Sequence, residues 1–130
     1  MAVEVICEVG VNHLGKLDVA KQLVDEAVKA GSKIVKFQTY DPDKLMRKSD
    51  PDFKLLESLA LSYPDFKELA KYCEGSGIEF LTTPGELDSL RFAVEELGVK
   101  RVKLGSDDLT NARLQWAVRQ TGLPKIQSTG

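Results

Sequence analysis

Seven polar side chains stand at the ends of five short apolar stretches, where together they could bind a small anion. The stretches are VEVICEVG, IVKFQT, IEFLTT, KRVKLGS and LPKIQSTG, and the polar residues are Glu8, Lys36, Gln38, Thr83, Lys103, Ser106 and Ser128. Lysine supplies a positive charge, and serine and threonine hydroxyls supply directional hydrogen bonds. If the stretches are parallel strands of a barrel, their C-terminal ends converge on one face, where active sites lie.

Lys36 also has a purely structural interpretation, as the partner of Glu8 in a salt bridge inside the barrel. A buried lysine is costly unless it is paired, so each lysine needs an anion from the protein or from a ligand. Lys103 favours the anion-pocket interpretation, because a second cation needs a second partner. The small residues of KLGS (103–106) and QSTG (127–130) would also let a phosphate approach the backbone closely.

The segments between the apolar stretches have helical periodicity, with apolar residues spaced i, i+3, i+4 and i+7. These residues are Leu23, Val24, Ala27 and Ala30; Phe66, Leu69, Ala70 and Cys73; Leu87, Leu90, Val94 and Leu97; and Leu114, Ala117 and Val118. Helices between strands imply right-handed parallel crossovers, and glycines such as Gly31 and Gly98 suit the left-handed position after a helix. We therefore predict an α/β fold of the (β/α) TIM-barrel type, with parallel strands. It would be a partial barrel of four βα units plus a fifth strand, forming one domain over residues 1–130.

Alternation within the strands predicts which face each side chain occupies. Over residues 3–9, Val5 and Cys7 share the face that would pack on helices, while Glu8 points into the barrel. An antiparallel sheet with one solvated face would alternate similarly, but it would need hairpin turns where this chain has helical segments. The long connection from Tyr40 to about Tyr63, with a short helix near residues 53–61, suits a lid or substrate loop or a plain surface insertion.

Composition excludes several classes of protein. A net charge of −2 gives no general attraction to nucleic acid or anionic membranes. No apolar run approaches the roughly 20 residues that span a bilayer, and no secretory signal opens the chain. Cys7 and Cys73 are too few for a disulfide framework, which fits a reducing compartment. We therefore expect a cytoplasmic protein with no nucleic-acid or membrane partner.

Five motifs in order closely resemble those of the sialic acid synthases, which include the N-acetylneuraminate, pseudaminic and legionaminic acid synthases. The motifs are CEVGVNHLG (7–15), VKFQT (35–39), FLTTP (80–84), VKLGSDDLTN (102–111) and QSTG (127–130). The resemblance covers nearly the whole chain as the N-terminal half of the family's barrel. It implies a transferase of sialic acid and carbohydrate biosynthesis that condenses phosphoenolpyruvate with an N-acetyl amino sugar such as N-acetylmannosamine, releasing phosphate.

The resemblance also implies roles for individual residues. The phosphoenolpyruvate pocket would comprise Lys36, Thr83, Lys103, Ser106 and Ser128. Glu8 would lie near the sugar and the forming bond, so that Glu8 and Lys36 are the candidate catalytic residues. Gln38 and Asp108 match positions that contact the sugar or order the site, and Asn12 and His13 match the first loop.

The resemblance further implies a divalent metal, Mn²⁺ or Mg²⁺, that polarises the sugar aldehyde, and a homodimeric full-length enzyme. The family's histidine ligands lie beyond Gly130, so we expect no metal ligand in this chain and no activity from it alone. Gly85 departs from the family, in which phenylalanine is common at this position, and we expect the loss of an apolar wall there. Lys125 and Gln127 fall on the outward face of the fifth strand, where apolar residues are expected.

Three interpretations remain at this level. The chain is the N-terminal half of a sialic-acid-type synthase, or part of another phosphoenolpyruvate-using barrel such as a deoxy-sugar-phosphate synthase, or a non-catalytic half-barrel that binds an anion or a subunit. The motifs favour the first.

Overall fold

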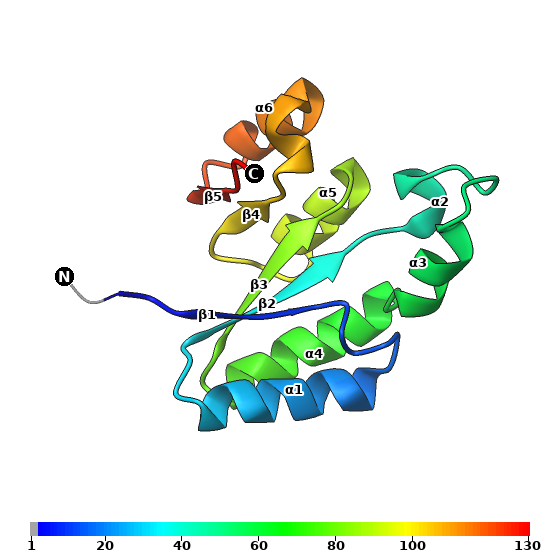
Figure 1. Cartoon of the computed structure of the whole chain (residues 1–130). Coiled ribbons are helices and arrows are strands. Elements are labelled where there is room, and N and C mark those ends of the chain that lie inside the picture. Colours follow the sequence, from blue (N-terminus) through cyan, green and yellow to red (C-terminus); the bar gives the residue numbers. More distant parts are fainter. Residues whose placement is uncertain (1–2) are drawn as a thin grey trace.

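The computed structural model describes residues 3–130, which form a mixed α/β structure with helices packed against a curved run of strands (Figure 1). The strands are β1 (Ile6–Gly10), β2 (Ile34–Thr39), β3 (Glu79–Pro84), β4 (Val102–Leu104) and β5 (Lys125–Gln127). The helices are α1 (Leu17–Lys29), α2 (Pro42–Leu45), α3 (Phe53–Leu59), α4 (Tyr63–Gly75), α5 (Leu87–Glu95) and α6 (Ala112–Gln120), with a 3-10 turn η1 at Asp107–Thr110.

The strands form two hydrogen-bonded ladders. The first has the order β1-β2-β3 and the second joins β4 to β5, and every pair within them is parallel. The strands β3 and β4 are neighbours in space, although no ladder connects them. The predicted partial barrel of TIM type, with four βα units and a fifth strand, is therefore confirmed.

Local sequence signals explain where the helices begin and end. Ser62 and Asp65 form a capping box at the start of α4, and Asn111 accepts a hydrogen bond from the Leu114 N–H at the start of α6. Gly31 follows α1 with a φ of +80°, in the left-handed conformation that closes a helix at low cost for glycine. These signals set the length of each βα unit and so the height of each strand end.

The core consists of two apolar clusters, one under each ladder. The first lies between β1–β3 and the helices α1 and α4, which cover one face of that ladder (Figure 1), and the second surrounds β4, α5 and α6. Phe80 and Leu97 contact both clusters. The rings of Phe37 and Phe80 stack with centroids 5.5 Å apart. Apolar contact through β3 thus joins the two ladders.

The first strand is shorter than the sequence predicts. It begins at Ile6, which pairs with Ile34 at the start of β2, so the residues before it have no strand opposite them. Val5 is exposed for that reason, although the alternation predicts that it packs against helices; that expectation is wrong for Val5. Val9 is buried, and Cys7 packs against the first core cluster.

The long connection after β2 holds two short helices, α2 and α3, and the helix predicted near residues 53–61 is confirmed as α3. The connection is attached at several points. The Tyr40 hydroxyl donates to the Leu56 carbonyl over 3.0 Å, and Lys44 pairs with Asp88 of α5 at 2.6 Å. Within residues 3–130, the structure has no helix of the length and apolarity that a membrane crossing requires.

Candidate functional site

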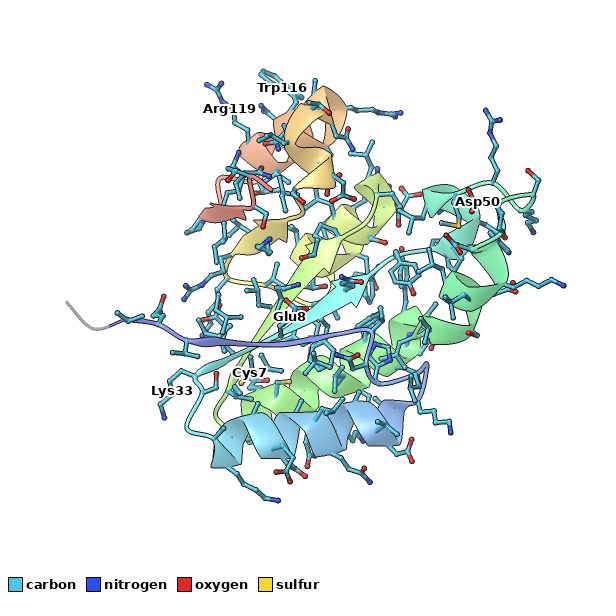
Figure 2. All side chains as sticks on the ribbon, viewed as in Figure 1. Cys7, Glu8, Lys33, Asp50, Trp116 and Arg119 are labelled. Carbon is cyan, nitrogen blue, oxygen red and sulfur yellow. The ribbon has the colours of Figure 1, made fainter. Side chains whose placement is uncertain are left out.

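One half of the candidate site lies on the first ladder. The Glu8 carboxylate is 2.7 Å from the Lys36 ammonium, and these two residues also pair in the β1–β2 register. The ammonium donates to the Thr83 hydroxyl at 3.2 Å. The Lys36 side chain is only 8% exposed, whereas that of Glu8 is 55% exposed, so the carboxylate faces an open side of the pair. Figure 2 labels Glu8 on β1, where that strand passes in front of β2 in this view.

The other half of the site lies on the second ladder. Lys103 in β4 donates from its ammonium to the Leu104 carbonyl at 2.7 Å and to the Ser128 hydroxyl at 3.1 Å. Ser128 directly follows β5, and its own N–H donates to the Leu104 carbonyl at 3.1 Å. In contrast to Lys36, Lys103 makes no ion pair with a carboxylate among residues 3–130. Its positive charge is therefore the less compensated of the two.

The two halves face one another. Burial lowers the pKa of Lys103, and the positive charge of Lys36 lowers it further, while Glu8, Asp107 and Asp108 act in the opposite direction. The effect of the Lys36 charge on the Lys103 pKa indicates that the two ammonium groups lie close enough to repel each other. The structure thus brings together Glu8, Lys36, Thr83, Lys103 and Ser128 at one end of the partial barrel.

Two further predicted residues lie at the edge of this group. Gln38 is exposed and pairs in register with Thr83. A Cβ placed on Gly10 would lie 3.0 Å from a Glu8 carboxylate oxygen and 4.0 Å from the Gln38 amide nitrogen, so both side chains flank this glycine. Ser106 is exposed at the start of η1, and its hydroxyl does not cap the turn. Both side chains can turn toward a ligand without breaking a bond of the fold.

Asp108 is the buried carboxylate of the site. Its side chain accepts a hydrogen bond from the Asn111 amide at 3.3 Å. Burial is the largest cause that raises the pKa of Asp108, and the charge of Asp107 adds to it, whereas hydrogen bonds from Asn111 and the Gly105 backbone lower it. The position suits a carboxyl group that orders the loop beside Lys103.

His13 is a core residue of the first loop. It is 1% exposed, its Nδ1 accepts from the Gly15 N–H at 3.1 Å, and its ring lies 6.1 Å from that of Phe37. The Nε2 atom is buried without a hydrogen-bond partner among residues 3–130, and burial lowers the pKa of the ring. His13 therefore shapes the loop that follows Glu8, while Asn12, one residue earlier, is exposed.

The residues described do not by themselves form a metal site. No group of three or more His, Cys, Asp and Glu side chains among residues 3–130 could hold an ion. Glu8 is paired with Lys36, and the Nδ1 of His13 already accepts a hydrogen bond. The expected Mn²⁺ or Mg²⁺ would therefore need ligands from outside this chain, and it stays a prediction.

Two features of the site were not foreseen in the sequence. At Gly85, an added Cβ would lie 2.9 Å from the Tyr40 Cβ and 3.2 Å from a Leu45 methyl carbon, so Tyr40 and Leu45 already fill the space above this glycine. These two side chains are the apolar contacts beside Gly85, and the loss of an apolar wall there stays a prediction. The amide of Asn111 holds Asp108, and the helix-capping pattern at Asn111 is the signal that could have placed it there.

Comparisons with known proteins identify relatives of this chain. The NeuB family model matches residues 23–130. An uncharacterized protein of Methanocaldococcus jannaschii is 40% identical over 97% of this chain and 37% of its own length. The N,N'-diacetyllegionaminic acid synthase of Legionella pneumophila is 36% identical over 97% of this chain and 39% of its own length. The chain therefore spans about two fifths of these curated relatives.

Among solved structures, the N-acetylneuraminic acid synthetase of Leptospira borgpetersenii, determined in complex with citrate, has a TM-score of 0.94 and 30% identity. The match covers 100% of this chain and 45% of that one. The similarity therefore includes every element that carries the candidate site, from β1 to the residues after β5.

Proposed function

The chain belongs to the NeuB family, and we propose that it supplies the phosphoenolpyruvate-binding part of a sialic-acid-type synthase. Relatives of the chain include synthases of N,N'-diacetyllegionaminic acid, of N-acetylneuraminate 9-phosphate and of pseudaminic acid. The condensation itself, its acceptor sugar, its divalent metal and its homodimeric assembly would belong to the whole protein, of which this chain corresponds to about two fifths.

The observation that carries the proposal is the convergence of two lysines and two hydroxyls from different ladders. Lys36 with Thr83 and Lys103 with Ser128 form two matching ammonium–hydroxyl pairs at 3.2 and 3.1 Å. Phosphoenolpyruvate carries a phosphate and a carboxylate, so two separated cations match its two charged groups. Since the lysines repel each other without a ligand, an anion between them would relieve that repulsion.

The lysines would act by electrostatics that are in place before the reaction begins. During the proposed condensation, negative charge builds up on the phosphate as it departs, and fixed ammonium groups stabilise that charge with little reorganisation. Glu8 and Gln38, on the exposed rim of the pocket, would face the amino sugar. Asp108 would hold the loop of Lys103 and Ser106 in place for the phosphate.

The test is to measure the binding of phosphoenolpyruvate to the 130-residue chain by calorimetry or ligand-shift NMR. We expect a dissociation constant of about 1 mM, which corresponds to about −4 kcal/mol. The affinity should fall as salt rises, because an open site is screened. Lys103→Met keeps the aliphatic stem and removes the charge, so it should abolish measurable binding while the fold stays intact.

Lys100→Met is the matched control. Lys100 is exposed just before β4, so this substitution removes one positive charge at a position away from the site. Equal affinity of the two variants would show that Lys103 is structural and that the pocket is not a phosphoenolpyruvate site. The structural interpretation has one observation in its favour, because the 2.7 Å Glu8–Lys36 pair already satisfies Lys36 without a ligand.

A further inference from the structure

The two halves of the candidate site belong to separate ladders, so something other than strand hydrogen bonding must fix the distance between them. Lys36 and Thr83 lie on the β1-β2-β3 ladder, and Lys103 and Ser128 belong to the β4-β5 unit. Among residues 3–130, the side-chain hydrogen bonds and ion pairs that join the segment before Arg101 to the segment from Arg101 onward all come from Arg101.

Arg101 contacts the first residue of β3 and the segment before β1, at the end of the barrel opposite the site. Its Nε is 2.8 Å from one oxygen of Glu79, and its Nη2 donates to the other oxygen at 3.0 Å. Its Nη1 donates to Glu4, just before β1, at 3.0 Å. The Nε contact has the distance of an ion pair but not the angle of a hydrogen bond, since that Glu79 oxygen has no hydrogen-bond partner.

The contact with Glu79 is the stronger of the two. The side chains of Arg101 and Glu79 are 25% and 15% exposed, whereas that of Glu4 is 63% exposed. Exposed ion pairs contribute little to stability. An arginine–carboxylate contact at two points in a shielded position also fixes the orientation of the two side chains. Glu79 opens β3, and Thr83 lies near its other end, so this contact sets the height and tilt of β4 against the strand that carries the Lys36 partner.

Arg101 and Lys103 are two residues apart and therefore point to the same face of β4. The distance between them along the strand is about 7 Å. A shift of Arg101 relative to β3 must therefore move Lys103 relative to Lys36 by a similar amount. Apolar contacts around Phe80 also join the ladders, but they are not directional, whereas the hydrogen bond and ion pair of Arg101 with Glu79 are.

We infer that Arg101 is a positioning residue, which clamps the two ladders together through Glu79 and Glu4 and so sets the separation of Lys36 and Lys103. It touches no part of the pocket and acts only through the strands. The effect on ligand affinity rests on the proposed function, whereas the effect on the lysines does not.

Two measurements on the 130-residue chain test the clamp. The first is the titration of Lys103 in the absence of ligand, followed by NMR of its side-chain carbons. In Arg101→Met the ladders separate, so the pKa of Lys103 should rise toward its ordinary value as burial and the repulsion by Lys36 decrease. The second is the affinity for phosphoenolpyruvate, which should fall on the order of tenfold, a typical coupling between distant groups.

Lys100→Met, one residue away, removes the same charge and should change neither quantity. Arg101→Lys keeps the charge but loses the two-point contact, and it should shift both quantities in the same direction by a smaller amount. If Arg101→Met fails to fold, the Arg101→Lys variant alone tests whether Arg101 positions Lys103. A merely structural role would lower the unfolding temperature and leave the Lys103 titration unchanged, and that result would overturn the inference.

If the wild-type chain does not bind phosphoenolpyruvate, the proposed function fails, and the Lys103 titration alone then decides the role of Arg101. An unchanged titration in folded variants refutes the clamp even if phosphoenolpyruvate binds well.

Discussion

Replacing Glu8 by glutamine should strengthen anion binding, although Glu8 is a candidate catalytic residue. The Glu8 carboxylate lies 2.7 Å from the Lys36 ammonium, so it occupies part of the space that a ligand anion would take. Glu8→Gln keeps the shape of the side chain and removes its charge. The pocket then becomes more positive by one charge, and Lys36 is left without its ionic partner.

The magnitude follows from Coulomb's law. The Glu8 carboxylate and a ligand anion at a distance of about 6 Å would repel each other by roughly 0.7 kcal/mol in water. At an effective dielectric constant of about 20, the repulsion would be about 3 kcal/mol. Because the Glu8 side chain is 55% exposed, the lower part of that range applies. A gain of about 1 kcal/mol corresponds to roughly fivefold tighter binding. The same change should destabilise the free chain by about 1–2 kcal/mol, less than for a fully buried pair.

Calorimetric titration with phosphoenolpyruvate at low and high salt measures the gain in affinity. Thermal unfolding with and without ligand measures the loss of stability. Glu95→Gln, an exposed position on α5, controls for the change in net charge. The gain should shrink at high salt because the charges are screened. Weaker or unchanged binding in Glu8→Gln would refute the reasoning, since it would mean that Glu8 does not oppose the anion. In a whole synthase the same variant should bind phosphoenolpyruvate better and turn over more slowly.

Two further predictions concern stability. Burial raises the pKa of Asp108 in the folded chain, so its contribution to stability is fully present below the unfolded pKa and is lost as pH rises through the folded pKa. Asp108→Asn should therefore raise the Tm at neutral pH by about 1–3 °C and leave it unchanged at acid pH, and a lower Tm at pH 7 would contradict this. At Gly15 the φ is +69° and an added Cβ would meet the Ser58 carbonyl at a distance that backbone atoms do not allow. Gly15→Ala should cost about 2–4 kcal/mol in urea unfolding, against about 1 kcal/mol for Gly31→Ala, where φ is +80° and the space is open; equal costs would contradict the clash.

The fold could be predicted because its signals are local. Each helix has an apolar stripe, and glycines such as Gly31, Gly98 and Gly122 take positive φ values where the helices end. Those signals fix the order of strands and helices, and right-handed crossovers then leave one arrangement of parallel strands. The exposure of Val5 could not be predicted in this way, because it depends on where the opposite strand begins rather than on the alternation within β1.

The grouping of the site could be predicted for the same reason, but the contacts within it could not. That Lys36 and Lys103 lie near each other follows from alternation and from parallel strands, and the charge of Lys36 accordingly lowers the pKa of Lys103. The pairing of Lys103 with a hydroxyl rather than a carboxylate depends on the register of β4 and β5 and on the backbone after β5. Arg101 lies in a charged stretch with no motif, and its two partners are 22 and 97 residues away in the sequence.

The Glu8–Lys36 pair shows why the sequence left two interpretations of Lys36 open. A structural salt bridge and an anion pocket awaiting its ligand both require a carboxylate beside the buried ammonium when no ligand is bound, because an unpaired ammonium is too costly there. The contact itself therefore does not distinguish them. Their difference lies in exposure, since a structural pair is best shielded on both sides, whereas here the ammonium is buried and the carboxylate is largely open. An open carboxylate can swing away as a ligand anion takes its place, so that the buried ammonium stays paired throughout.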